Sequence, residues 1–216
     1  MKADAVVLGI AGVLFGVLVG WMLGAQQVER AAAPVSTAAS APPAQASTQT
    51  APAKGAGRTP APLDAARVQD LEGRAQAAPR DAAVRAELAN LYFDADRFQD
   101  AARWYEAALE IDPNDPDVST DLAICYYYLD QAPRAIRQFE ASLAIDPKHT
   151  KSLLNLGIVR AFGTQDLRGA AEAWQQVVTI APSDSPEARA ARQALDGLRS
   201  AHPDIVSSVE SSSKGS

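Results

Sequence analysis

Apolar residues recur along residues 82–182 in a pattern that repeats with a fixed period. Pro79, Pro113 and Pro147 stand 34 residues apart, and Pro182 follows after 35. The last three of these prolines end similar phrases, Ala-Leu-Glu-Ile-Asp, Leu-Ala-Ile-Asp and Val-Thr-Ile-Ala. Alanine-rich helix formers dominate the chain and strand-like alternation is rare, which predicts an all-α protein. The period predicts a solenoid, because each unit needs its neighbours to bury its apolar face.

Helices are also predicted on both sides of the three periods. Val68, Leu71 and Ala75 share one face of a leading helix. A second amphipathic helix, preceded by Ser185, is of the kind that caps a solenoid. The predicted segments are a flank at 1–4, a membrane helix at 5–25, a linker at 26–62, a leading helix at 63–81, repeats at 82–115, 116–149 and 150–184, a capping helix at 185–202 and a polar, frayed tail at 203–216.

The amino-terminal segment has the length and polarity of a membrane anchor. Residues 5–25 carry no charge and reach about 31 Å as a helix, which matches the hydrocarbon core of a bilayer. Trp21 falls near the exit end, where indole favours the interface. The alternative is a cleavable signal peptide. We favour the anchor, because the apolar run is long and Leu23-Gly24-Ala25 is a poor cleavage site.

Glycines recur on one face of this predicted membrane helix. Gly12, Gly16, Gly20 and Gly24 are four residues apart, a spacing that lets a second helix approach closely and that allows a homodimer. The alternative is that glycine is simply common in membrane helices. The lysine and arginine counts on the two sides of the span are nearly tied, and we predict the amino terminus in the cytoplasm and the repeats in the periplasm.

Composition narrows the remaining classes of function. The net charge of −6 and the pI near 4.9 argue against nucleic acid as a partner. Residues 26–62 are rich in Ala, Pro, Ser and Thr and are predicted to be a disordered spacer. The single cysteine, Cys125, excludes an intramolecular disulfide and a Cys-x-x-Cys site. No motif for catalysis, a metal, a cofactor or a small-molecule substrate is present, so the sequence predicts neither an enzyme nor a cofactor.

The repeat resembles the tetratricopeptide repeat (TPR), in which two antiparallel helices form each 34-residue unit. The family places small residues and aromatics at set positions, so that the helices cross tightly and the aromatics fill the gaps between units. Repeat 3 departs from this pattern, because Arg160 stands where an aromatic is expected and its turn is one residue longer. The matching residues are Leu88, Ala89, Tyr92, Ala101, Tyr105 and Ala108 in repeat 1, Leu122, Ala123, Tyr126, Ala135, Phe139 and Ser142 in repeat 2, and Leu153, Leu156, Gly157, Ala170, Trp174 and Val177 in repeat 3.

The resemblance implies a concave groove that is lined by the first helix of each unit and binds a polypeptide segment. Aromatic, aliphatic and asparagine side chains suit a peptide with apolar anchors, because asparagine can bond a peptide backbone with both its donor and its acceptor. The alternative for Tyr127, Tyr128 and Phe162 is packing against a neighbouring unit. The predicted groove residues are Asn90, Phe93, Ile124, Tyr127, Tyr128, Lys151, Leu154, Asn155, Ile158 and Phe162.

Some TPR domains hold a terminal carboxylate with lysine, arginine and asparagine. Asn90 and Lys151 fall on matching positions of this chain, whereas Ala86 and Asn155 replace a lysine and the arginine. Asp121 replaces an asparagine and would repel a carboxylate. We therefore do not expect this clamp here.

Repeat 3 and the start of the cap, residues 169–189, are similar to the corresponding part of bacterial cytochrome c biogenesis TPR proteins. Those proteins are membrane-anchored, and their TPR domains hold the apocytochrome for haem ligation outside the cytoplasmic membrane. The sequence thus predicts a membrane-anchored scaffold that binds a polypeptide and helps to assemble an envelope complex, c-type cytochromes included. The alternative is a structural protein that self-associates and has no dedicated peptide ligand.

Overall fold

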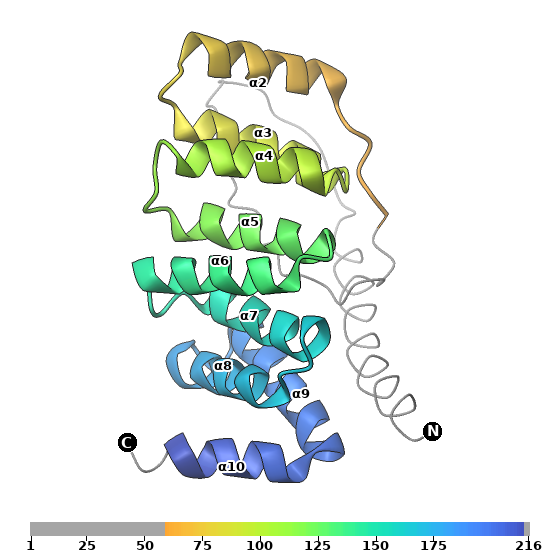
Figure 1. Ribbon diagram of the computed structural model, residues 1–216, viewed down its shortest axis with the longest axis vertical. Helices are drawn as coiled ribbons and strands as arrows, with labels where there is room; N and C mark the ends of the chain where they lie inside the picture. The colour runs from red at the N-terminus through yellow and green to blue at the C-terminus, as the bar shows by residue number, and fades with distance from the viewer. Residues whose placement is uncertain (1–58, 214–216) are drawn as a thin grey trace, which may run out of the picture.

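The computed structural model describes residues 59–213, and every regular element in that part is a helix (Figure 1). The helices stack in chain order, from α2 at one end to α10 at the other (Figure 1). The all-α solenoid predicted from the period is confirmed over this part of the chain. Its nine helices are α2 (Ala65–Ala77), α3 (Ala82–Asp94), α4 (Phe98–Leu109), α5 (Pro116–Tyr128), α6 (Ala132–Ile145), α7 (Thr150–Gly163), α8 (Leu167–Ile180), α9 (Pro186–Ala201) and α10 (Pro203–Ser213).

Capping residues set where several of these helices begin. The side chains of Asp81, Asp115 and Ser185 each accept a hydrogen bond from the backbone N–H three residues on, which satisfies an amide that lacks an intrahelical partner. α5 and α9 also begin with proline, whose missing N–H costs nothing in the first turn. The helix start predicted after Ser185 is confirmed.

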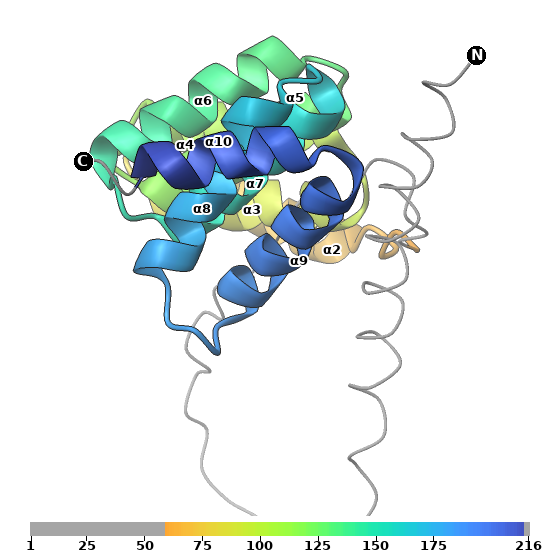
Figure 2. The ribbon, with the colours of Figure 1, turned by 90° about the horizontal axis from the view of Figure 1, so that it is seen from below.

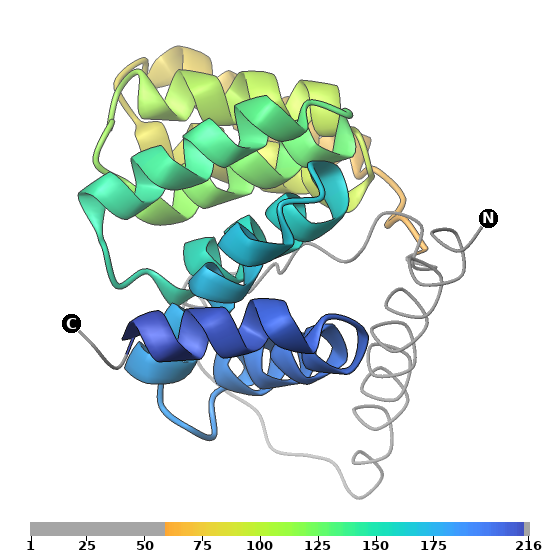
Figure 3. The same ribbon diagram turned by 60° about the horizontal axis from the view of Figure 1, so that its bottom comes forward.

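The helices pair into antiparallel hairpins, and the hairpins pack on one another. Each predicted repeat holds one hairpin, α3–α4, α5–α6 or α7–α8, and the second helix of each hairpin packs on the first helix of the next element. The views of Figures 2 and 3 show this stack from below and tilted, with α9 and α10 across its end. The first helices of neighbouring units also touch, as α5 with α7 and α7 with α9.

Each hairpin turns through one residue in the left-handed region. These residues are Asp96, Asp130 and Gln165, with φ of 56°, 63° and 59°. Aspartate tolerates this conformation better than glutamine, because its short side chain can hydrogen-bond locally. The turn of repeat 3 is therefore the least favourable of the three.

We predict that Gln165→Gly stabilises the fold. Glycine removes the Cβ strain of a left-handed residue, and the larger freedom of its unfolded chain offsets part of this gain. The net increase in the free energy of unfolding should be roughly 0.5 kcal/mol, measured by urea denaturation. Gln165→Ala is the matched control, because alanine keeps the Cβ and should give no gain. Equal effects of the two variants would contradict this explanation.

Arg160, the residue that departs from the family pattern, makes a contact in repeat 3 that a tyrosine makes in repeat 2. In repeat 2 the Tyr126 hydroxyl donates to Glu106 at 2.6 Å. The equivalent acid of the next repeat is Glu140, and the Nη2 atom of Arg160 lies 3.2 Å from its Oε1 atom. Arg160 also donates to the carbonyl of Gly169 across the hairpin. The change of residue type thus keeps the link between neighbouring units.

This equivalence makes Arg160→Tyr a tolerated change. A tyrosine at this position can donate to Glu140 as Tyr126 does to Glu106, whereas Arg160→Ala removes every contact of the guanidinium. We expect Arg160→Ala to lower the free energy of unfolding by about 1–2 kcal/mol and Arg160→Tyr to lower it by less than half as much. Chemical denaturation of both variants measures the difference, and an equal loss would show that the link to Glu140 carries little stability.

The end of the chain differs from the prediction of a polar, frayed tail. Residues 203–213 form α10, which packs on α8 and α9. Val206 and Val209 are buried in the cluster that also holds Trp174. These apolar residues are few and lie among serines, so the segment has little overall hydrophobicity. Two buried valines on one face nevertheless extend the core over the capping helix α9.

The predicted membrane helix at 5–25, its four glycines and most of the linker at 26–62 lie outside the described residues. Within residues 59–213, no helix combines the length and the apolar character needed to span a bilayer. The anchor, the glycine face and the periplasmic location therefore stay predictions.

Candidate functional site

The predicted groove residues lie along the row of first helices α3, α5 and α7. Phe93 on α3 and Tyr128 on α5 bring their rings to a centroid distance of 6.2 Å, which joins the first two helices of the row. α5 and α7 are in direct contact. The side chains of Phe93, Ile124, Tyr127, Leu154 and Asn155 are buried, and those of Asn90, Tyr128, Lys151, Ile158 and Phe162 are half-buried.

Aromatic rings join repeats 1 and 2 at one end of this row. Tyr128 stacks on Phe98, the first residue of α4, with ring centroids 4.2 Å apart and planes within 4° of parallel. Phe93 meets the edge of Phe98 at 5.3 Å. Offset and edge-to-face aromatic pairs of this kind stabilise a packed interface. Tyr127 and Tyr128 pack in the cluster of repeats 1 and 2, and Phe162 packs against the cluster of α7 to α10. The packing role weighed for these three residues is therefore present, and binding of a peptide by their side chains stays a prediction.

The two asparagines predicted to bond a peptide backbone take part in the fold. Asn90 accepts a hydrogen bond from the Tyr105 hydroxyl. Asn155 is fully buried and donates to the carbonyl of Lys151 at 2.8 Å. Repeats 1 and 3 thus use their amides to fix side chains and helix turns, and the sequence pattern alone could not distinguish this use from recognition of a ligand.

Lys151 is held by carboxylates of α5. Its Nζ atom lies 2.9 Å from Oδ1 of Asp121 and 3.9 Å from Oδ1 of Asp117. The closer contact is an ion pair rather than an aligned hydrogen bond. Burial raises the pKa of Asp121 to about 6, although Lys151 acts in the opposite direction. Lys151 is thus paired with carboxylates of its own chain, and the expectation that this chain has no carboxylate clamp stays a prediction.

A group of buried hydroxyls lies beside this ion pair. The six buried polar residues of the described part all belong to α5, α6 and α7; we call them the polar seam. Around the Oγ atom of Ser152 converge Thr120, Ser142 at 2.7 Å and Nδ1 of His149 at 2.7 Å. Thr120 and Ser142 also donate to the carbonyl of Pro116. The seam consists of Ser119, Thr120, Asp121, Ser142, Ser152 and Asn155.

Three side chains are arranged in the order acid, histidine and serine, as in a hydrolase triad, but a substrate cannot reach the serine. They are Asp117, His149 and Ser152. Nε2 of His149 lies 3.3 Å from Oδ1 of Asp117, and Nδ1 faces Ser152. This hydrogen bond from His149 lowers the pKa of Asp117. Ser152 has no exposed surface and sits among other hydroxyls, so no substrate can reach its oxygen. The arrangement is therefore a structural network. Nothing in the residue pattern predicted this network beyond the hydroxyl residues themselves.

The structure also shows the state of the single cysteine and whether metal ligands are grouped. Cys125 is buried, and burial raises the pKa of its thiol well above the ordinary value, which keeps it protonated and unreactive. In residues 59–213 no group of three or more His, Cys, Asp or Glu side chains is placed to hold a metal ion.

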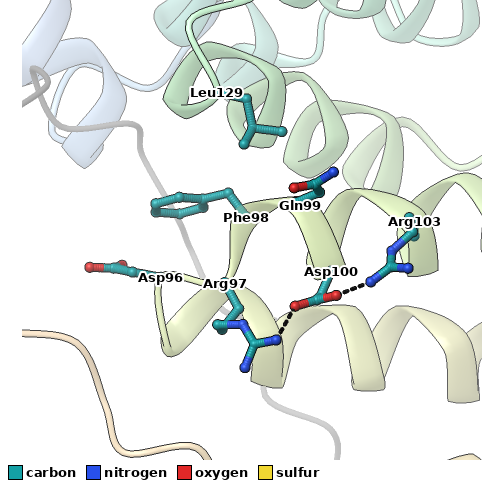
Figure 4. Close-up of a pocket in the computed structure, with 7 residues that line it drawn as sticks. All are labelled: Asp96, Arg97, Phe98, Gln99, Asp100, Arg103 and Leu129. Carbon is teal, nitrogen blue, oxygen red and sulfur yellow. Dashed lines mark hydrogen bonds and ion pairs between the residues drawn. The ribbon is translucent and has the colours of Figure 1, made fainter.

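A hollow of about 540 Å³ lies at the turn between α3 and α4 (Figure 4), and Phe98 in its lining stacks on Tyr128 of the predicted groove. Asp100 sits between Arg97 and Arg103 and pairs with both, so the charges of the hollow are largely balanced from within. Its other lining residues are Asp96, Phe98, Gln99 and Leu129.

Comparison with known protein families finds a match for part of the repeat region. The family model described as tetratricopeptide repeat matches residues 63–119 and 93–156. No curated protein matches the sequence.

Solved structures with the same arrangement of helices include the first TPR domain of human RPAP3, which is 26% identical, has a TM-score of 0.51 and matches over 58% of this chain and 98% of that one. The Sgt2 TPR domain from Aspergillus fumigatus is 24% identical, with a TM-score of 0.50 over 55% of this chain and 78% of that one. MamA is 17% identical and has a TM-score of 0.55, and the match covers 68% of this chain and 87% of that one. The last two show the fold alone.

Proposed function

We propose that the chain is a tetratricopeptide-repeat protein and that the face formed by α3, α5 and α7 binds a polypeptide segment. TPR domains are generally scaffolds for proteins or peptides and are typically non-catalytic. One observation supports this use here: α5 and α7 are in contact, and the apolar side chains of Ile158 and Phe162 on α7 are only half-buried. Half-buried apolar side chains can gain contact area when a peptide with apolar anchors covers them.

We propose further that the domain works at the cytoplasmic membrane of a bacterium, on its periplasmic side, and assists the assembly of an envelope complex. The uncharged segment 5–25 supplies the anchor, and the linker at 26–62 holds the domain off the bilayer. The similarity of residues 169–189 to cytochrome c biogenesis TPR proteins supports an apocytochrome c as the bound polypeptide. Neither a cofactor nor a small-molecule substrate is needed for this role.

Site-specific photo-crosslinking tests the proposal. A photoreactive residue is placed in the full chain at Ile158 and, as the matched control, at Ile180, an exposed residue at the end of α8. The probe is a haem-free c-type cytochrome added to the chain in neutral detergent. We expect a crosslink from position 158 and at least a tenfold weaker one from position 180. Equal labelling would contradict binding at this face.

A second candidate function is self-association through the membrane helix, favoured by the spacing of Gly12, Gly16, Gly20 and Gly24. In that case Gly16→Leu should abolish dimers of the full chain in chemical crosslinking and leave the cytochrome crosslink unchanged. Dimers that persist in the Gly16→Leu variant would contradict association through the glycine face.

A further inference from the structure

The apolar core of the described part divides at α7. One cluster is built mainly from α3 to α6, and it reaches α7 through Leu156 and Val159 and α8 through Ala173. The other cluster holds α7 to α10 and includes Leu153, Leu154 and Ala161 of α7. The first turns of α7 meet α5 and α6 mainly through the polar seam, with Leu143 of α6 packed against both clusters, while later turns meet them through apolar contacts.

Such a division makes the first turns of α7 easy to separate from α5 and α6. Hydroxyls that part from one another regain hydrogen bonds from water, so their separation costs little net free energy. Separated apolar side chains gain no such compensation. An opening at the seam would pivot on Leu156 and Val159 of α7 and Ala173 of α8, which keep these helices attached to the first cluster.

The protonation state of Asp121 is linked to this opening. Its carboxylate is buried between α5 and α7, where it pairs with Lys151. Opening exposes the carboxylate to water, where ionisation is favoured, whereas the closed interface disfavours the charge because of its low polarity. The closed form therefore holds a proton more readily than the open form does.

Several other titratable groups lie around Asp121. Burial raises the pKa of Tyr105 and Cys125 well above their ordinary values, so both stay neutral near pH 6. Asp117 stays ionised, because His149 lowers its pKa. The groups that face Asp121 are Lys151 on α7, Asp115, Asp117 and Cys125 on α5 and Tyr105 on α4, with His149 next to Asp117.

We propose that the polar seam is a proton-sensitive hinge, at which the first turns of α7 separate from α5 and α6 more readily in neutral than in acidic solution. The hinge divides the solenoid into a block of α2 to α6 and a block of α7 to α10. It changes the angle between α5 and α7, and its operation does not depend on which ligand the first helices bind.

The direction follows from the two protonation states of Asp121. The pKa of Asp121 in the closed form is about 6, and in the open form it returns towards its ordinary value near 4. Between these two values, each unit of rising pH makes opening roughly tenfold easier, and above about pH 6 the effect levels off. From pH 5 to pH 7 the opening equilibrium should therefore increase roughly tenfold.

Native-state hydrogen exchange of the full chain in neutral detergent measures the opening. Protection factors, corrected for the intrinsic exchange rate at each pH, are compared for the amides of residues 153–156 in α7 and of residues 102–108 in α4. We expect the α7 amides to be roughly tenfold better protected at pH 5 than at pH 7, with a much smaller change in α4. An equal change in both helices would overturn the hinge, because it would report unfolding of the whole domain.

Variants assign the response to Asp121. Asp121→Asn should remove the difference between pH 5 and pH 7 in α7, and Asp184→Asn, a change of an exposed aspartate, should keep it. A response that survives Asp121→Asn and disappears in His149→Asn would overturn the role of Asp121. Should Asp121→Asn fail to fold, the comparison of α4 with α7 in the unchanged chain still decides whether the hinge exists.

Discussion

Gly157→Ala should destabilise the protein strongly, although alanine is the better helix former. A Cβ atom at position 157 would lie 2.5 Å from Cδ1 and 2.7 Å from Cε2 of the Trp174 indole. The indole cannot simply move away, because its Nε1 donates to the carbonyl of Leu154 at 3.2 Å and the ring is buried. Overpacking of this kind costs about 1–3 kcal/mol, and we expect a loss near the upper end, about 3 kcal/mol, in urea denaturation.

The matched controls are Gly73→Ala in α2 and Gly197→Ala in α9. At both positions an added Cβ meets no atom within 4 Å. These changes should raise the free energy of unfolding by up to about 1 kcal/mol, because alanine has the higher helix propensity. The opposite signs at position 157 and at the two controls separate the steric clash from the propensity.

The clash also predicts a rescue. In repeats 1 and 2 the equivalent pairs are Ala89 with Tyr105 and Ala123 with Phe139, all buried in one cluster. Repeat 3 combines a larger ring with a smaller partner, so glycine and tryptophan compensate each other in size. Gly157→Ala with Trp174→Phe should therefore recreate the pair of repeat 2 and be more stable than Gly157→Ala alone. A double variant as unstable as the sum of its two single changes would contradict the compensation.

The sequence was sufficient to predict the stack of helices because its signals are local. Prolines close each period, Asp115 and Ser185 cap the helices that follow them, and small and aromatic residues recur in register. α10 escaped prediction because two valines among serines give only a weak apolar stripe. The fold class thus follows from the repeat, while the final helix depends on a docking surface that α8 and α9 create.

The candidate site was harder to predict because of how α5 is packed. Residues 118–127 of this helix are all buried, since α4, α6 and α7 surround it. Its periodicity therefore does not separate a packed side from a side available to a ligand. Ile124 and Tyr127 fall in this buried run, whereas Ile158 and Phe162 on α7 remain half-buried. The polar seam was also beyond the sequence, because Thr120, Ser142 and Ser152 meet only after three helices have packed.

Lys151→Met should produce the second large loss of stability, and this loss should depend on pH. The change leaves the Asp121 carboxylate buried without its cation, a situation that costs about 3–5 kcal/mol in proteins. Removing the cation also takes away the influence that lowers the pKa of Asp121, which then rises above its present value of about 6. We expect a loss of about 3 kcal/mol at pH 8, measured by urea denaturation of the full chain.

The sign of the pH effect distinguishes this explanation from lost packing. A raised pKa in the folded state means that the folded state binds the proton more tightly, so stability is gained as the pH falls through that pKa. At pH 5 Asp121 is mostly neutral with or without Lys151, and the loss should shrink to about 1 kcal/mol. Lys148→Met, a change of an exposed lysine nearby, should not lower the free energy of unfolding at pH 5 or at pH 8. Because a well-packed apolar pair can replace a buried ion pair, adding Asp121→Leu to Lys151→Met should restore most of the stability at pH 8. A loss that is the same at pH 5 and pH 8 would mean that Lys151 acts through its methylene chain and not through its charge.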